Sequence, residues 1–296
     1  MKILACPDLH LTDKTPVNRI DDYPKTQYDK VCRILNFDSD VVVLPGDVFD
    51  SYKVSHNVVQ QYAELFSLLR KSIYVVYGQH DMHYHSLNTD NSPLKVLESA
   101  ELVCRLTEEP RPVGNNVFLY GASFGEAVPK PVNKKATNIL VIHKMVVNTK
   151  LWEAQEDFIY SEELLKYGFD CIISGDNHER FMWKDKKDRL LVNCGSLMRS
   201  SRDQIKHKPS VCLIDTEKSF SGFTELKIKP AENVFDLQKI EEEVAHSKEI
   251  EAFVEGLKAD TDLNGLDFVS NLKSFCKRNK VGKEITTFIE KCLESL

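Results

Sequence analysis

The sequence predicts an α/β protein in which a mixed sheet, or two packed sheets, is covered by helices. Up to about residue 229, short runs of β-prone residues alternate with stretches that have helical periodicity. The helical stretches cover residues 26–35, 58–69 and 161–167. After residue 186 helical stretches become rare, and β-prone runs follow one another. These later runs cover residues 190–194, 211–215 and 223–228.

Five of the β-prone runs are each followed by a short polar fragment. The runs are Lys2–Cys6, Val41–Leu44, Ile73–Tyr77, Ile139–Ile142 and Cys171–Ser174. The fragments are, in the same order, Asp8-Leu9-His10, Gly46-Asp47, Gly78-Gln79-His80-Asp81, His143 and Gly175-Asp176-Asn177-His178. Because open α/β sheets place their binding sites at the carboxyl ends of strands, we expect these polar side chains to lie close together.

The residue types in these fragments indicate a site for two metal ions. The three carboxylates of Asp8, Asp47 and Asp176 and four imidazoles in one place would repel one another, or be unfavourable to bury, unless cations lie among them. Asp8 and His10 are two residues apart in extended chain, as are Asp176 and His178, so each pair can point in one direction. Asp47 can bridge two cations roughly 3.5–4 Å apart. Oxygen and nitrogen ligands without sulfur favour manganese, iron or zinc over calcium.

Such a site suits the hydrolysis of phosphoesters. Two cations can activate water and hold the phosphoryl oxygens while negative charge builds up on them. The leaving oxygen still needs a proton, and His80 is the predicted donor, with Asp81 behind it to orient its ring. Each fragment alone is typical of a turn, a helix cap or a structural histidine. The ordered succession of five fragments after five strands is what favours a catalytic site.

The composition is that of a globular protein with an acidic end. Of 296 residues, 42% are hydrophobic, and the net charge is −6. Residues 231–296 hold 14 acids and 9 bases, whereas residues 1–230 hold 31 acids and 30 bases. A nearly neutral body and an acidic tail argue against a general polyanion binder.

The cysteines and the apolar runs predict a cytoplasmic protein. Eight cysteines occur without C-x-x-C spacing, and Cys171, Cys194 and Cys212 fall within predicted strands, so we expect reduced core residues. No apolar run approaches the roughly 20 residues that a membrane helix needs. Met1 to Leu4 enter a strand directly, without the pattern of a signal peptide.

A domain boundary is predicted at Lys229-Pro230, which separates a body of residues 1–230 from a helical segment of residues 231–296. Apolar residues recur at helical spacing in this segment, for example at Leu266, Val269 and Leu272. Amphipathic helices need a surface to cover their apolar face. That surface could be the body itself or another protein.

Taken together, the five fragments resemble the calcineurin-like metallophosphoesterase superfamily over about residues 1–230. The resemblance implies a four-layer α/β/β/α sandwich with a dinuclear metal centre between its loops, to which the short C-terminal helical appendage is added. Gly46-Asp47-Val48-Phe49-Asp50 is similar to the GDxFD motif of SbcD-type nucleases, the nuclease subunits of double-strand-break repair complexes. Gly195-Ser196, directly after a strand, is similar to the late Gly-Ser turn of the same group.

The resemblance also implies a role for each residue. One metal would be held by Asp8, His10 and His178. The other metal would be held by Gln79, His143 and Asp176. Asp47 would bridge the two metals, and His80 would be the proton donor.

Two positions depart from the superfamily pattern. Gln79 stands where Asn is usual, and Asp176 stands where His is usual. Both belong to the same metal, whose surroundings become harder and more anionic. We therefore expect two divalent ions, with Mn²⁺ favoured, Mg²⁺ or Fe²⁺ as alternatives and a weakened preference for zinc. The same changes leave open a site with reduced activity.

The sequence thus predicts a metal-dependent DNA nuclease of the SbcD type, with exonuclease or endonuclease action left open. Its expected partners are DNA and an SMC-like coiled-coil ATPase of the SbcC type, which would bind the C-terminal helices; a homodimer is a further option. One alternative is a phosphatase or cyclic-nucleotide phosphodiesterase that acts on small substrates. Another is a binding subunit with weakened catalysis.

Basic residues gather late in the body, and two interpretations of them stay open. These residues are Arg180, Lys184, Lys186, Lys187, Arg189, Arg199, Arg202, Lys206 and Lys208. They could contact a nucleic-acid backbone near the metal loop. Alternatively, they lie on a solvated hairpin, since Asp185, Asp188 and Asp203 are interleaved with them.

Overall fold

The computed structural model describes residues 1–114, 116–149, 157–218, 220–242, 245, 276–277, 281–282 and 285–287. Internal contacts divide the chain into two units, Met1–Phe235 and Asp236–Leu296. The helices predicted in the tail, and with them the expected ATPase-binding surface, lie almost entirely outside the described residues. The fold below is that of the first unit.

Two six-stranded sheets make up the first unit, in the orders β14-β13-β1-β2-β3-β4 and β11-β12-β10-β7-β6-β5. The first sheet contains β1 (Lys2–Ala5), β2 (Val41–Leu44), β3 (Ser72–Val75), β4 (Cys104–Arg105), β13 (Ser210–Asp215) and β14 (Phe220–Glu225). The second contains β5 (Arg111–Gly114), β6 (Val117–Ala122), β7 (Thr137–His143), β10 (Cys171–Gly175), β11 (Phe181–Lys184) and β12 (Leu190–Asn193). A separate short pair is formed by β8 (Val146–Val147) and β9 (Ile159–Tyr160).

Each sheet has a set of parallel strands, with antiparallel strands at one margin of the first sheet and at both margins of the second. Strands β1 to β4 are parallel, whereas β13 is antiparallel to both β1 and β14. Strands β6, β7, β10 and β12 are parallel, with β5 and β11 antiparallel at the two edges. Antiparallel neighbours can be joined by short turns without a crossover helix. This explains why β-prone runs replace helices after residue 186.

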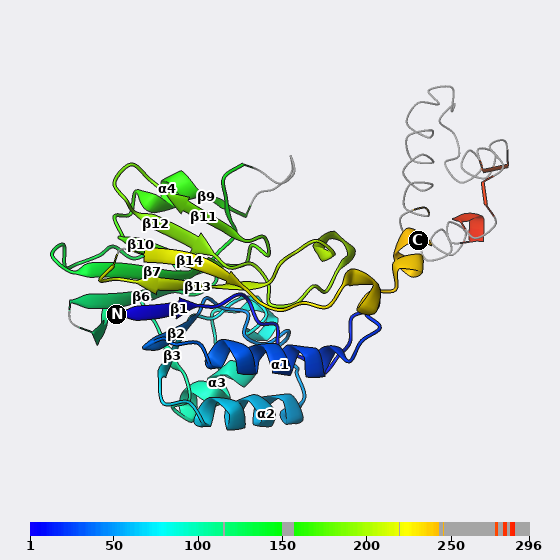
Figure 1. The fold of residues 1–296 in the computed structure, drawn as a ribbon, viewed down its shortest axis with the longest axis horizontal. Helices are drawn as coiled ribbons and strands as arrows, with labels where there is room; N and C mark the ends of the chain where they lie inside the picture. Colours follow the sequence, from blue (N-terminus) through cyan, green and yellow to red (C-terminus); the bar gives the residue numbers. More distant parts are fainter. Residues whose placement is uncertain are drawn as a thin grey trace. The chain divides into compact units, whose positions relative to one another are not determined.

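Helices cover the outer faces of both sheets (Figure 1). The helices α1 (Tyr23–Leu35), α2 (His56–Ser67) and α3 (Pro93–Ser99) lie beside the first sheet, and the short α4 (Ser161–Leu165) lies beside the second. One-turn 3₁₀ helices occur at η1 (His83–His85), η2 (Arg202–Gln204) and η3 (Ala231–Asn233). The side chains of Asp22, Ser55 and Ser92 accept backbone N–H groups in the first turns of α1, α2 and α3, which is how such residues cap helices.

Strand residues alternate between the apolar layers that hold the unit together. On β1, Leu4 packs in the cluster that contains α1, α2 and α3, whereas Ile3 packs between the sheets. On β7, Ile139 packs between the sheets and Leu140 packs with Leu164 of α4. All five side chains are fully buried. Three apolar layers thus separate four layers of secondary structure, which confirms the predicted α/β/β/α sandwich.

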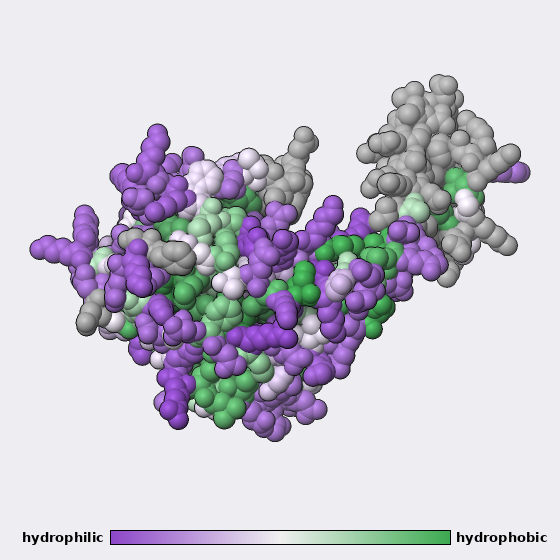
Figure 2. All heavy atoms as spheres, viewed as in Figure 1, coloured by the Kyte–Doolittle hydropathy of each residue, from purple (hydrophilic) through white to green (hydrophobic). Residues whose placement is uncertain are grey.

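The surface and the cysteines agree with a globular unit. Figure 2, in the same view as Figure 1, shows hydrophilic side chains around the rim of the first unit, with apolar side chains reaching the surface between them. Within the described part of the chain, no helix is long and apolar enough to cross a membrane. Cys171, Cys194 and Cys212 are buried and unbridged, as predicted.

Candidate metal centre

The polar fragments meet at one end of the sandwich. The predicted ligands follow β1, β2 and β3 of the first sheet, and they end or follow β7 and β10 of the second. Within each sheet these strands are parallel, so their carboxyl ends lie at the same edge. Direct hydrogen bonds join the loops: the His10 N–H donates to the Asp47 carbonyl at 2.9 Å, and the Asp176 N–H donates to Asp8 Oδ2 at 2.8 Å.

Asp47 lies in the middle of the cluster. Its Oδ2 atom is 3.6 Å from Nε2 of His10 and 3.3 Å from Nε2 of His143. Ligand atoms of Asp8, His10 and His178 all lie within 4.8 Å of one another, and so do those of Asp8, Asp47 and His143. A carboxylate placed between two groups of ligands has the position that a bridging ligand requires.

The cluster buries several ligand atoms that have no hydrogen-bond partner. They are Asp8 Oδ1, Asp47 Oδ2, Gln79 Oε1 and His143 Nε2. Buried polar atoms are normally paired, so this group of unpaired atoms requires an explanation. Carboxylate and amide oxygens together with imidazole nitrogens are ligands for divalent transition metals. The residues present therefore fit divalent metal ions.

Backbone carbonyls fix which ring nitrogen of His143 and of His80 carries a proton. Nδ1 of His143 donates to the Pro45 carbonyl at 2.7 Å, and Nδ1 of His80 donates to the Asp50 carbonyl at 2.8 Å. A carbonyl oxygen can only accept, so the proton lies on Nδ1 and Nε2 is left for other partners. Metal-binding histidines are commonly oriented in this way.

The loops that carry the ligands have an unusual backbone. His10, Asp47 and Asp176 have positive φ angles of 46°, 45° and 78°, a region that residues with a side chain rarely adopt. Gly46, at φ 104°, lies so close to the second sheet that a Cβ atom there would be 2.3 Å from Nδ1 of His143. Strained backbone of this kind concentrates at functional sites.

The two residues that depart from the superfamily pattern contact each other. Nε2 of Gln79 donates to Oδ1 of Asp176 at 2.9 Å. Gln79 follows β3 of one sheet, and Asp176 follows β10 of the other. The longer Gln side chain and the carboxylate therefore form one hydrogen-bonded pair, and the two departures are not independent.

Carboxylates and imidazoles adjust one another's pKa. Burial favours a higher pKa for Asp47, but His143 and then His10 outweigh it and hold the pKa of Asp47 well below its usual range. Burial favours a lower pKa for His143, but Asp47 and Asp8 raise that pKa to about 10. Burial raises the pKa of Asp8 to about 8, against the opposing effect of His143. Protonated imidazoles thus balance the carboxylates, and divalent cations would supply the same balance.

The comparison with protein families decides what kind of site this is. Residues 1–219 match the model of the calcineurin-like phosphoesterase superfamily domain. The chain belongs to this superfamily. Its members are generally metal-dependent phosphoesterases that bind divalent ions, in agreement with the clustered ligands.

Comparisons with single proteins give distant likenesses. No curated protein matches the chain. Among solved structures, TT1561 of Thermus thermophilus is 13% identical, with a TM-score of 0.48 over 76% of this chain and 99% of that chain. Vps29 complexed with Zn²⁺ from Entamoeba histolytica is 14% identical, with a TM-score of 0.37 over 76% and 98%. Vps29 of Chaetomium thermophilum is 15% identical, with a TM-score of 0.36 over 77% and 93%.

The contacts of Asp81 differ from the predicted ones. Its fully buried carboxylate accepts three backbone N–H groups, those of Val48 (3.2 Å), Phe49 (2.9 Å) and Gly78 (3.0 Å). It therefore ties the loop after β2 to the loop after β3. The structure therefore does not place Asp81 against the His80 ring as predicted: both carboxylate oxygens of Asp81 accept backbone N–H groups, and Nδ1 of His80 is held by the Asp50 carbonyl.

A cavity of about 210 Å³ opens beside the ligands and includes two residues that sequence analysis did not assign. Oδ1 of Asp50 lies 3.6 Å from Nδ1 of His10, and Nε2 of Gln204 lies 3.4 Å from Nδ1 of His178. Asp50 could have been found, because it closes the motif that begins at Gly46. Gln204 comes from η2, far along the chain, and no local pattern marks it.

The late basic residues divide into two groups. Residues 185–189 form the turn between β11 and β12, where Lys184 pairs with Asp188 at 3.0 Å and Arg189 pairs with Asp185 at 2.6 Å. Strand β12 starts at Leu190 and runs parallel to β10, so this turn lies at the end of the sheet away from the metal ligands. The solvated hairpin is therefore the correct interpretation here. Arg199 is instead buried near the ligand end.

Proposed function

We propose that this phosphoesterase is a metal-dependent DNA nuclease of the SbcD type. The main observation is the position of Asp47 between His10 and His143, in a cluster of buried ligand atoms that lack partners. The motif from Gly46 to Asp50 supports the subtype. Its last residue contacts the His80 ring through its carbonyl and approaches His10 through its carboxylate, so both of its aspartates act within the site.

The residues divide the chemical work as follows. When bound, two divalent cations supply the Lewis acid that activates water and stabilises the phosphoryl oxygens. Asp8, His10 and His178 would hold one ion, Gln79, His143 and Asp176 the other, and Asp47 would bridge them. His80, whose Nδ1–H donates to the Asp50 carbonyl, would act as the imidazolium and give its second proton, on Nε2, to the leaving oxygen. The oxygens of the Gln79–Asp176 pair favour manganese.

The first test is cleavage of end-labelled single- and double-stranded DNA with Mn²⁺. Loss of the proton donor in His80→Ala should slow cleavage by about 10²–10⁴-fold, while the metal content of the protein stays the same. His56→Ala, at the exposed start of α2, is the matched control and should cleave like the wild type.

Each contrary result has a definite meaning. Equal cleavage by His80→Ala and the wild type would remove His80 from the acid role. If the wild type cleaves no DNA at any enzyme concentration but hydrolyses bis(p-nitrophenyl) phosphate, the chain is a small-substrate phosphodiesterase instead.

We further propose that residues from Asp236 onward bind an SMC-like ATPase. A truncation should end after Phe235 and not at the predicted boundary of residue 230. Val234 and Phe235 are buried in the first unit, and the Ile20 N–H donates to the Val234 carbonyl. Residues 1–235 should therefore fold and keep phosphoesterase activity while losing ATPase binding in a pull-down assay. Retained binding would place the contact on the first unit.

A further inference from the structure

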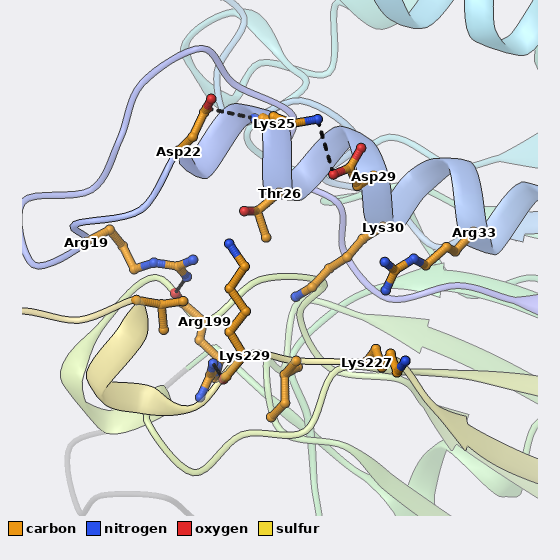
Figure 3. A pocket seen from close by; sticks show the side chains of 12 residues that line it. Arg19, Asp22, Lys25, Thr26, Asp29, Lys30, Arg33, Arg199, Lys227 and Lys229 are labelled. Carbon is orange, nitrogen blue, oxygen red and sulfur yellow. Dashed lines mark hydrogen bonds and ion pairs between the residues drawn. The ribbon is translucent and has the colours of Figure 1, made fainter.

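A second cavity, of about 280 Å³, lies between α1 and the segment that follows β14 (Figure 3). Its lining is strongly basic, although one of its acids, Asp29, pairs with Lys25 at 3.5 Å. We call this cavity the basic pocket. Six further cations line it: Arg19, Lys30, Arg33, Arg199, Lys227 and Lys229. In Figure 3 the side chains of Lys30 and Lys229 enter the space from opposite sides.

The most informative residue of the basic pocket is Lys30. Its side chain is buried, and its ammonium group donates to the Leu197 carbonyl at 2.8 Å. Among the described residues, no carboxylate lies within ion-pair distance of it. Burial, followed by the charges of Arg19 and Arg199, lowers the pKa of Lys30 to about 7. A buried cation among other cations is unfavourable unless an anion joins it.

The two arginines at the back of the basic pocket are held rigidly. Arg19 pairs with Asp21 at 2.7 Å and donates to the Arg199 carbonyl. Arg199 donates to the Ile205 carbonyl at 3.0 Å, and both guanidinium groups lie over the Phe235 ring. Both arginines are buried. This charge is therefore fixed in place before any ligand arrives.

The cations at the mouth of the basic pocket complete the arrangement. Arg33, Lys227 and Lys229 are exposed, and within the described part of the chain none of them forms an ion pair. Exposed lysines alone would be solvated and would indicate no ligand. Here they surround the buried Lys30 and Arg199, which have no carboxylate at ion-pair distance among the described residues, and a tetrahedral oxyanion offers several acceptors to such a group at once. We propose that the basic pocket binds a phosphoryl group, at a second anion site separate from the metal centre.

The basic pocket is a close neighbour of the metal centre. The Tyr23 hydroxyl lies 2.7 Å from Ser200 Oγ, and both residues line the cavity beside the metal ligands. The guanidinium of Arg19, which lines the basic pocket, lies over the Tyr23 ring, 4.9 Å from its centre. The two cavities are thus separated by little more than one aromatic side chain. The phosphoryl group could belong to a substrate strand or be free inorganic phosphate.

The test measures binding of inorganic phosphate to the full chain by titration calorimetry. The double variant Arg33→Gln with Lys229→Gln should weaken binding at least about tenfold, because two charge-assisted contacts are lost. Lys30→Met should do the same. Lys186→Gln with Lys187→Gln removes the same charge from the distant hairpin and should bind like the wild type. Asp47→Asn, which disables the metal centre, should also keep phosphate binding.

The outcomes separate the basic pocket from the metal centre without using activity. Phosphate binding that is lost in Asp47→Asn but kept in Arg33→Gln with Lys229→Gln would overturn the proposal, as would absence of binding to the wild type. Arg33 and Lys229 are exposed, so we expect the double variant to fold. The test therefore stands even where Lys30→Met does not fold.

A second arm identifies the source of the phosphoryl group, and only this arm depends on the proposed nuclease function. A single-stranded DNA 10-mer is titrated into Asp47→Asn, which does not cleave it, at several salt concentrations. If the basic pocket holds a strand phosphate, adding Arg33→Gln and Lys229→Gln should weaken DNA binding and reduce the salt slope by about 1.4. An unchanged slope with lost phosphate binding identifies free phosphate as the ligand.

Discussion

The metal centre and the basic pocket differ in the sign of their buried charge and in how that charge is balanced. In the metal centre buried carboxylates lie beside imidazoles that can carry the opposite charge, as Asp47 Oδ2 lies 3.3 Å from His143 Nε2. In the basic pocket Lys30 is buried against a carbonyl, with Arg19 and Arg199 near it. The first site can exchange its protons for metal ions, because its anionic charge is already balanced. In the second site Asp21 pairs with Arg19, whereas Lys30 has no carboxylate at ion-pair distance among the described residues, so we expect a ligand that is itself an anion to balance it.

The largest effect is expected at the centre of the first region. Asp47→Asn removes the charge that lies between His10 and His143. We expect metal uptake to fall and phosphodiesterase activity to drop by about 10³-fold or more, which corresponds to about 4 kcal/mol in the barrier. Metal content by mass spectrometry and hydrolysis of bis(p-nitrophenyl) phosphate are the measurements.

The control for this variant is Asp38→Asn, a carboxylate that pairs with Lys2 on the surface. It should leave metal content and activity unchanged. Normal activity in Asp47→Asn would mean that the carboxylate does not bridge metals.

The next effect concerns the second region and depends on pH. In the unfolded chain Lys30 has a pKa near 10.4, whereas burial and neighbouring Arg19, Arg199 and Arg33 lower it to about 7 in the folded chain, against the opposing effect of Asp21. Between these values the unfolded chain binds one more proton, so stability rises with pH. Urea unfolding should show a rise of about 2 kcal/mol at most between pH 7 and pH 9.

Lys30→Met is the reference for this pH effect, since it removes the titrating group and cancels contributions from the rest of the chain. The rise should be missing in the variant, and added phosphate should reduce it in the wild type by stabilising the charged form. A wild type and a variant with parallel pH profiles would show that folding does not lower the pKa of Lys30.

Sequence analysis found the first region and missed the second, for a physical reason. The ligands follow parallel strands, and the carboxyl ends of parallel strands converge, so short local motifs such as Asp8-Leu9-His10 predict their meeting. The basic pocket joins α1 to residues about 200 positions later, such as Lys229, and no local pattern reports that contact. Lys30 was not identified either, because a basic residue in an amphipathic helix is ordinarily solvated.

Within the first region, predictions failed where the answer depended on side-chain direction. Most of the longer strands followed from periodicity and the α/β/β/α layers from the family resemblance, whereas the strands β4, β5, β6, β8, β9 and β11 and the helix α3 were not foreseen. Asp81 was assigned to the His80 ring because the two residues are adjacent in sequence. The structure instead directs Asp81 to backbone N–H groups, a contact that adjacency does not reveal.

A smaller effect tests that reassignment. Asp81→Asn offers one carbonyl oxygen to three N–H donors, so unfolding free energy should fall by about 1–2 kcal/mol. Urea unfolding measures it, and Asp90→Asn, on the exposed surface, is the control. If Asp81→Asn keeps full stability but shifts the pH profile of hydrolysis as His80→Ala does, Asp81 acts on the His80 ring after all.

The smallest expected effect concerns the metal preferred at the position where this chain departs from its superfamily. Asp176→His replaces a charged oxygen by a neutral nitrogen and should move the preference from manganese toward zinc by about tenfold, which is about 1.4 kcal/mol. Competition titrations of Mn²⁺ against Zn²⁺ measure it. An identical preference in the wild type and Asp176→His would refute the idea that this residue sets the ion.

The hydrogen bond between Gln79 and Asp176 makes this prediction sharper. Because the two side chains contact each other, the effects of Gln79→Asn and Asp176→His on metal preference should not add, and the double variant should differ from the sum of the single ones. Additive effects would mean that each residue meets the metal on its own. Coupled effects would mean that the pair acts as one ligand unit, so that the departure from the superfamily lies in their contact and not in either residue alone.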